Sequence, residues 1–239
     1  MKKIVKTLAA VMGVAILLLP TKTYAQTKFT VNGKTDFVSD YIWRGADQNS
    51  GFSVQPSLTL GYAGFSINVW GSQTLSRWNL ETPAKEFDIN LSYSLKNFSV
   101  TVSDYWWSGV NQPYGHYKDS HFFEGTFAYR FGDSFPLTLS WSTMFAGADK
   151  NVEGKLQGST YINASYPISL PADITLTPAI GFTPWKGYYH NKAAFTDISL
   201  KANKDIKVTD QFSIPVFVQA IVAPAYDRTY LVTGFGLGF

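Results

Sequence analysis

The chain has 239 residues, a formal net charge of +3 and no cysteine, which excludes disulfide staples and cysteine-ligated metal sites. Aromatic residues make up 16% of the chain and charged residues only 15%, whereas soluble domains carry about 25% charged residues. This balance indicates that many aromatic side chains face an apolar medium.

The first 25 residues have the pattern of a secretory signal peptide. Lys2, Lys3 and Lys6 form a basic start, residues 8–19 form an apolar run, and Ala25 ends a small-residue cleavage site. The apolar run is shorter than the about 20 residues that a membrane-spanning helix needs. Loss of this segment lowers the net charge to about −1 and leaves no basic surface for nucleic acid. We expect one domain, residues 26–239.

The rest of the chain alternates between apolar and polar residues, the period of a β-strand, with no convincing helical stretch. We expect about twelve strands, each near the roughly 9–11 residues of a tilted membrane strand. The clearest runs from Glu86 to Leu95, and tight turns are expected at 63–64 and 96–97. Short connections alternate with longer aromatic ones. The pattern predicts an all-β transmembrane antiparallel β-barrel with short periplasmic turns and longer outer loops; a secreted soluble β-protein is the alternative.

Three finer expectations follow from the strand phases. The first strand extends from about Phe29 to Arg44, so that Asp40 and Arg44 share one face and could pair to order the first loop. The alternation breaks at residues 104–107, which predicts a bulge or a rim position. Aromatic residues form two girdles, the outer one comprising Tyr41, Trp43, Trp106, Trp107 and Phe145.

The carboxyl-terminal nine residues form the predicted closing strand. Leu231, Phe235, Leu237 and the terminal Phe239 share one face, and the opposite face carries Val232 and glycines. Such an ending is typical of bacterial outer-membrane barrels. An even strand count places both ends of the barrel on the periplasmic side, so this strand pairs with the first, and closure leaves no unpaired edge in lipid. We also expect the terminal aromatic residue to be recognised by the barrel-assembly machinery.

A motif near the amino terminus resembles a known family. Residues 37–48 contain Val38, Ser39, Asp40 and Tyr41, then Arg44–Gly45 and Gln48, as in the opening motif of the TorF-type porin family. Ala46 and Asp47 depart from the usual small polar pair of that family. The resemblance implies an outer-membrane barrel in a Gram-negative bacterium with a transport role and no assigned substrate.

Charged residues of both signs fall on the inward parity of the strands. Two interpretations stay open at this stage: a polar pore that filters solutes by charge, or charges that pair and plug a narrow lumen. The predicted lumen-lining residues are Lys34, Asp36, Asp40, Arg44, Glu86, Asp88, Glu124, Arg130, Asp197 and Lys201.

The sequence gives little sign of catalysis. Only His121 of the three histidines lies on the lipid-facing parity at the outer rim, and no serine has a nucleophile signature. The histidine spacings and dispersed carboxylates match no metal site. We therefore expect no enzyme activity, catalytic residue, cofactor or metal, with a lipid-modifying enzyme as the weakest alternative.

The outer loops carry aromatic residues that could stack on sugars or pack over the barrel mouth: Tyr114, Tyr117, Trp185, Tyr188 and Tyr189. The leading hypothesis is an outer-membrane porin for passive diffusion of small hydrophilic solutes, with membrane lipid around it. The alternative is a structural barrel without an open pore that binds a glycan or a partner at its surface.

Overall fold

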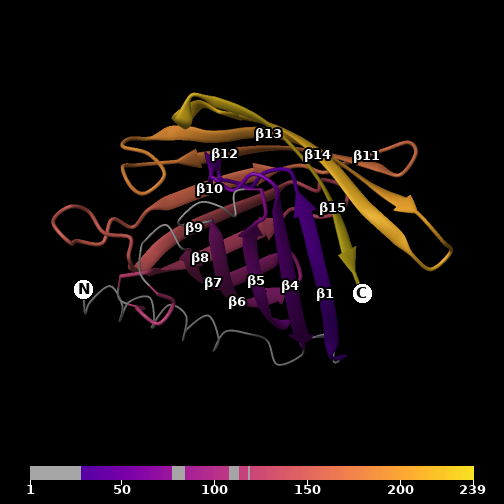
Figure 1. Ribbon diagram of the computed structural model, residues 1–239, viewed down its shortest axis with the longest axis horizontal. Helices are drawn as coiled ribbons and strands as arrows, with labels where there is room; N and C mark the ends of the chain where they lie inside the picture. Colours follow the sequence, from indigo (N-terminus) through magenta and orange to yellow (C-terminus); the bar gives the residue numbers. More distant parts are fainter. Residues whose placement is uncertain (1–27, 77–83, 108–112, 118) are drawn as a thin grey trace.

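The computed structural model describes residues 28–76, 84–107, 113–117 and 119–239, and the predicted signal peptide, residues 1–25, lies outside them. One antiparallel sheet dominates (Figure 1). Its strands are β1 (Thr30–Val38), β4 (Ser53–Tyr62), β5 (Phe65–Thr74), β6 (Lys85–Leu95), β7 (Phe98–Trp107), β8 (His121–Arg130), β9 (Thr138–Gly147), β10 (Thr160–Ser165), β11 (Ile168–Leu170), β12 (Ile174–Thr183), β13 (Ala194–Lys207), β14 (Ser213–Ala223) and β15 (Arg228–Gly238).

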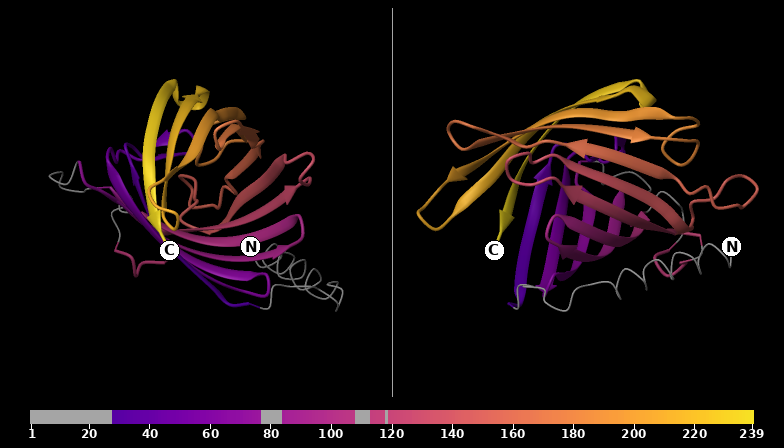
Figure 2. Two further views of the ribbon diagram at one scale, coloured as in Figure 1. Left: turned by 90° about the vertical axis from the view of Figure 1, so that its right-hand side faces the viewer. Right: turned by 180° about the vertical axis from the view of Figure 1, so that it is seen from behind.

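The sheet closes on itself. Neighbours in the chain pair with each other, β10 and β11 both pair with β12, and β1 pairs with β15. β10 and β11 are two parts of one strand interrupted at Tyr166 and Pro167, so the barrel has 12 strands. Figure 2 shows the yellow β15 beside the indigo β1. Closure pairs the backbone groups that an open sheet would leave exposed.

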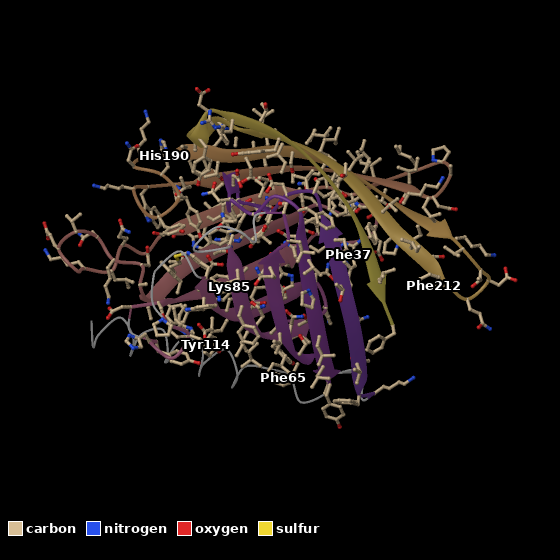
Figure 3. All side chains as sticks on the ribbon, viewed as in Figure 1. Phe37, Phe65, Lys85, Tyr114, His190 and Phe212 are labelled. Carbon is tan, nitrogen blue, oxygen red and sulfur yellow. The ribbon has the colours of Figure 1, made fainter. Side chains whose placement is uncertain are left out.

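The expected alternation of connections is confirmed. β4 and β5 are joined by Ala63 and Gly64, with φ angles of 51° and 85°, the left-handed pair that a two-residue hairpin turn requires. Lys96 and Asn97 form a second two-residue turn, which joins β6 to β7 and in which Lys96 has a positive φ of 52°. Figure 3 labels Phe65 and Phe212 at this turn end and Tyr114 and His190 at the loop end.

Burial is inverted relative to a soluble protein. Outward-facing residues such as Leu91, Phe127 and Ile198 are 55%, 46% and 44% exposed, whereas the buried set is mainly polar and includes Glu124 and Asp197. An apolar outer surface around a polar interior is the pattern of a barrel that spans a membrane. Within the described ranges, no helix is long and apolar enough to cross a bilayer.

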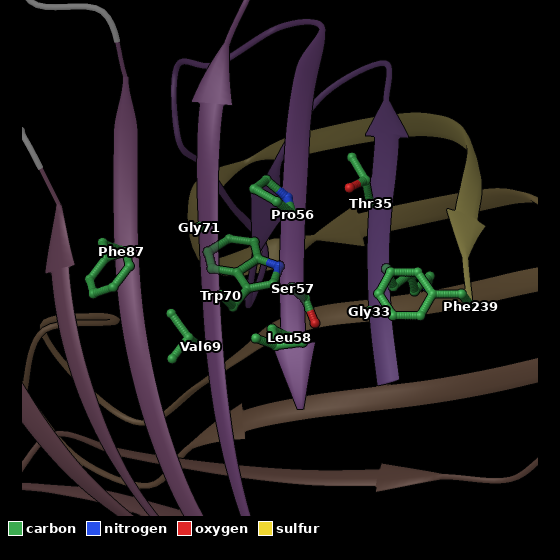
Figure 4. Close-up of a pocket in the computed structure, with 11 residues that line it drawn as sticks. Gly33, Thr35, Pro56, Ser57, Leu58, Val69, Trp70, Gly71, Phe87 and Phe239 are labelled. Carbon is green, nitrogen blue, oxygen red and sulfur yellow. The ribbon is translucent and has the colours of Figure 1, made fainter. Parts of the chain in front are cut away.

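The closing seam is built by small and aromatic residues. The rings of Phe37 and Phe235 stack 4.9 Å apart across β1 and β15. Phe239 extends the ladder through two backbone hydrogen bonds with Gly33 and lays its ring over that glycine, where a Cβ would lie 2.5 Å from the ring. Beside this ring, a hollow of about 340 Å³ lies on β1, β4 and β5 and reaches Phe87 (Figure 4).

Two expectations need correction, and a third is decided between its alternatives. The first strand ends at Val38 and not at Arg44, because the chain turns inward there to form a separate hairpin. β7 pairs regularly to its end at Trp107, so residues 104–107 take the expected rim position and do not form the alternative bulge. Bulges occur at Phe123–Glu124 and Gly181–Phe182 instead.

The outer girdle also differs from the prediction. Trp43 packs against Tyr105, Trp107, Tyr188 and Tyr189. Trp43, Tyr105 and Trp107 also pack on the buried cluster that contains Phe122, so these aromatic residues lie inside the mouth of the barrel. Alternation along a strand shows which residues share a face but not which face meets lipid.

Candidate functional site

The connection between β1 and β4 folds into the barrel and crosses its lumen. Residues 41–48 form what we call the inner hairpin, comprising β2 (Ile42–Trp43) and β3 (Ala46–Asp47), closed at its base by a 3.0 Å hydrogen bond from the Gln48 N–H to the Tyr41 carbonyl. In Figure 1 the hairpin is the short violet segment drawn near the β12 label.

The tip of the inner hairpin is a two-residue turn pressed against β13 and β14, which lie three and two strands from β1 in the sheet order. Arg44 and Gly45 have φ angles of 52° and 84°, and a Cβ on Gly45 would lie 2.1 Å from the carbonyl oxygen of Thr196. Only glycine allows this approach, since any side chain would clash with the backbone of β13. The hairpin therefore reaches from the seam to β13 and β14.

Arg44 fixes the hairpin to the far side of the lumen. Its two terminal nitrogens donate to the Glu124 carboxylate of β8 at 2.6 and 2.7 Å, and one also donates to the Tyr189 hydroxyl. Glu124 further accepts hydrogen bonds from Tyr105 at 3.0 Å and from Tyr189 at 3.1 Å. A bidentate arginine–carboxylate pair is among the strongest side-chain contacts in proteins.

The environment keeps this pair charged. The guanidinium carbon of Arg44 lies 4.6 Å from the ring centre of Trp43 and 4.5 Å from that of Tyr161. Burial works against the Arg44 charge, but Tyr189 and Glu124 outweigh it and raise the Arg44 pKa well above its ordinary value. Burial likewise raises the pKa of Tyr189, so its hydroxyl stays protonated and donates to Glu124.

Asp40 orders the base of the hairpin without contacting Arg44. Its carboxylate accepts hydrogen bonds from the Tyr41 and Gly51 N–H groups, each at 2.9 Å, and from the Ser50 hydroxyl at 3.1 Å. The expected alternative, an Asp40–Arg44 pair that orders the first loop, is therefore wrong about the partner, since Arg44 pairs with Glu124.

Below the hairpin, hydroxyl and amide groups line the inner wall. Asn68 donates to Ser57 at 3.2 Å, Asn90 donates to Asn68 at 3.2 Å, and Ser103 donates to Asn90 at 2.6 Å, forming one chain across β4 to β7. Such a wall offers hydrogen bonds to water and to polar solutes.

The predicted lumen charges separate along the barrel. Glu86, Asp88, Glu124 and Asp197 are all buried in the half nearer the loops, where Asp197 accepts hydrogen bonds from Tyr161 at 3.1 and 3.2 Å. Lys34 pairs with Asp36 at 2.8 Å towards the turn end.

The other two bases differ in their surroundings. The Lys201 ammonium lies 4.1 Å from the ring centre of Phe217 on the wall. Arg130 is half exposed and pairs with Asp133 of the adjacent turn at 3.2 Å, so it belongs to the rim at the turn end.

His121 lies on the outer face of β8 and is fully covered. Its Nδ1 is 2.6 Å from the Asp104 carboxylate and its Nε2 is 2.5 Å from the Tyr114 carbonyl oxygen. The Tyr117 ring stacks on it at 3.9 Å. Since both ring nitrogens have acceptors, Nε2 is not turned to a serine. His121 instead holds residues 113–117 of the preceding loop against the barrel.

The five loop aromatics do not form one surface. Tyr114 and Tyr117 cover His121, and Trp185 packs on Trp141 at the rim with ring centres 6.1 Å apart. Tyr188 and Tyr189 turn into the mouth and pack on the inner hairpin. The described residues contain no group of three or more acidic or histidine side chains suited to a metal ion.

Sequence reasoning missed the inner hairpin and the tyrosines that hold its tip. Arg44–Gly45 between the short pairs Ile42–Trp43 and Ala46–Asp47 is a hairpin signal that strand alternation obscured. Tyr105 and Tyr161 sit on strands at inward positions, but nothing in the sequence places them near Arg44, since their contacts span the lumen.

Comparison with known proteins gives a family. A family model described as "Bacterial protein of unknown function (Gcw_chp)" matches residues 22–229. The chain belongs to the Gcw_chp family. This match covers most of the chain. It shows membership of the Gcw_chp family and does not show membership of the TorF-type family. No curated protein matches the chain.

Among solved structures, this chain is similar to outer-membrane porins. A KdgM porin has a TM-score of 0.49 at 10% identity, with 87% of this chain and 97% of that chain covered. An OmpF complex with daunomycin from Salmonella typhi has a TM-score of 0.39 at 8% identity, covering 89% and 98%. The membrane-barrel assignment rests on the closed sheet and its exposure pattern rather than on these distant likenesses.

Proposed function

We propose that this protein is a passive channel for small hydrophilic solutes in the outer membrane of a Gram-negative bacterium, narrowed by the inner hairpin. The observation that carries the proposal is the polar inner wall with charges of both signs inside an apolar closed sheet. A wall of this kind offers hydrogen bonds to water and so stabilises a water-filled path, whereas a solid core would have no water to bind. Carboxylates near the mouth and Lys34 and Lys201 beyond them would set a weak charge preference.

Orientation, assembly and family belong to the same proposal. The short turns would face the periplasm, and Phe239 at the seam would serve as the signal for the barrel-assembly machinery, with outer-membrane lipid around the apolar face. The motif at residues 37–48 supports kinship with TorF-type porins. It contains both Asp40, which orders the base of the hairpin, and Arg44, which fixes its tip.

A second function has its own supporting observation. Because Arg44 joins the hairpin to Glu124 across the lumen, the barrel could be sealed at that level and act as a structural or surface-binding protein. The aromatic residues of the loops would then contact a glycan or a protein partner. Conductance separates the two functions.

The test compares the natural protein with a shortened hairpin in planar bilayers. Residues 42–47 are replaced by Asn–Gly, which joins Tyr41 to Gln48 by a two-residue turn and removes Arg44. We expect discrete conductance steps from the natural protein and larger steps from the shortened one. The control shortens the outer loop between Lys150 and Leu156, which pair as an isolated bridge, and should leave the conductance unchanged.

Two results would reject the channel. If neither protein conducts in any of the salts and solutes, the barrel has no open path. Silence of the natural protein with conductance only after shortening would establish the sealed barrel.

A further inference from the structure

We propose that the inner wall beside the inner hairpin holds a binding site for one organic ammonium group, formed by Glu86 and Asp88 and framed by Tyr41, Trp70, Tyr105 and Trp107. The site goes beyond the channel activity, because binding needs only access from the barrel and not passage through it.

The two carboxyl groups lack a cationic partner. Glu86 and Asp88 lie two residues apart on the inner face of β6 and are only 8% and 6% exposed. Within the part of the chain that the structure describes, no ion pair joins either of them to a lysine, arginine or histidine. They contact each other, which requires one shared proton and leaves one net negative charge.

Asp88 also presents an unused acceptor. Its Oδ1 is buried and has no hydrogen-bond partner among the described residues. Leaving a buried carboxylate oxygen unpaired is unfavourable by about 1–3 kcal/mol or more. A donor that enters from the lumen would remove this cost, and a cationic donor would also neutralise the pair.

Aromatic rings surround these oxygens. In the sheet register Asp88 lies between Trp70 and Tyr105, and Glu86 lies opposite Trp107. From the hairpin side, the Tyr41 ring meets Trp70 edge-on with centres 5.5 Å apart. Burial, followed by Glu86 and Asp88, raises the Tyr41 pKa well above its ordinary value, so its hydroxyl stays neutral.

The same lumen already holds one cation in this manner. Arg44 is bound by the Glu124 carboxylate and by the ring faces of Trp43, Tyr161 and Tyr189. The Glu86–Asp88 site has comparable carboxylates and rings, and none of the described lysine, arginine or histidine side chains forms an ion pair with it. Rings and a single net charge favour an organic ammonium ion over a divalent metal, which prefers six or more oxygen ligands.

The experiment titrates refolded protein in detergent micelles with n-propylammonium chloride and follows tryptophan fluorescence and binding heat. Potassium chloride at equal ionic strength and neutral 1-propanol are the comparison probes. We expect a saturable response to n-propylammonium alone. Asp88→Asn should weaken the apparent affinity about tenfold or more, the effect of losing one charge-assisted hydrogen bond.

Two further variants complete the test. Glu86→Gln should weaken binding in the same way, which guards against a folding defect in one variant, and folding is checked by heat-dependent gel mobility. Asp133→Asn, on an exposed turn, should bind as the natural protein does. An equal response to potassium or 1-propanol, no response at all, or unchanged affinity in both site variants would overturn the proposal. Conductance is not read, so failure here leaves the channel proposal standing.

Discussion

At the scale of single residues, the Arg44–Glu124 pair is the contact that decides where the inner hairpin lies. Both side chains are largely removed from water, with 12% and 0% of their surface exposed. Desolvating two charges offsets much of their attraction, so the intact pair contributes more to position than to stability. Removing one partner is a different matter, since it leaves a buried charge alone.

We therefore expect Arg44→Met to lower the free energy of unfolding by about 3–5 kcal/mol, because Glu124 stays buried without its counter-ion. The measurement is denaturant unfolding in lipid vesicles. Arg44→Met combined with Glu124→Gln should recover much of the loss. Arg130→Met removes an arginine from an exposed pair at the rim and should change little. A small effect of Arg44→Met would mean that the hairpin is held by the rings.

At the scale of elements, two connections are fixed to the barrel, one on its inner face and one on its outer face, by different side chains. The inner hairpin enters the lumen and is held by charge, whereas the loop segment of residues 113–117 lies on the outer face and is held by His121. At the other end, the turn after β8 is joined to its strand by the solvent-exposed Arg130–Asp133 pair. The length of a connection limits how far it can extend, and in each of these two connections one side chain, Arg44 or His121, fixes where it packs on the barrel.

For the outer loop, we expect His121→Ala to release residues 113–117 from β8 while the barrel stays folded. Limited chymotrypsin digestion should cut faster after Tyr114 and Tyr117, and the lipid profile of cells should not change. His116→Ala is the matched control, because His116 contributes to this loop through its backbone carbonyl. Lipid turnover that disappears in His121→Ala would favour the lipid-modifying enzyme instead.

At the scale of the whole molecule, closure between β1 and β15 makes the sheet a barrel. Thr35 and Leu237 are directly opposite in the register, and opposite residues of antiparallel strands lie about 4.5–5.5 Å apart at Cα. The seam joins residues about two hundred positions apart, so it forms only after long-range pairing, the slow step for such sheets.

Closure can be tested with cysteines, because the natural chain has none to compete. Thr35→Cys with Leu237→Cys should form a disulfide on oxidation, which makes the unfolded chain migrate faster in a gel. Thr35→Cys with Phe235→Cys is displaced by one pleat, with Cα atoms about 7–8 Å apart, and should cross-link poorly. Equal yields would contradict the register of the seam.

The sequence by itself determined the strands, the turns at Ala63–Gly64 and Lys96–Asn97, and the closing strand ending at Phe239. These features depend on alternation and turn chemistry, which act between near neighbours. The charges of Glu86, Asp88 and Asp197 were placed on the inner face for the same reason.

Only the tertiary structure decided that the chain leaves the sheet at Val38, that Arg44 meets Glu124, and that Trp43 and Trp107 face inward. Each depends on groups that approach across the lumen from strands far apart in the chain, and strand periodicity carries no information about such contacts.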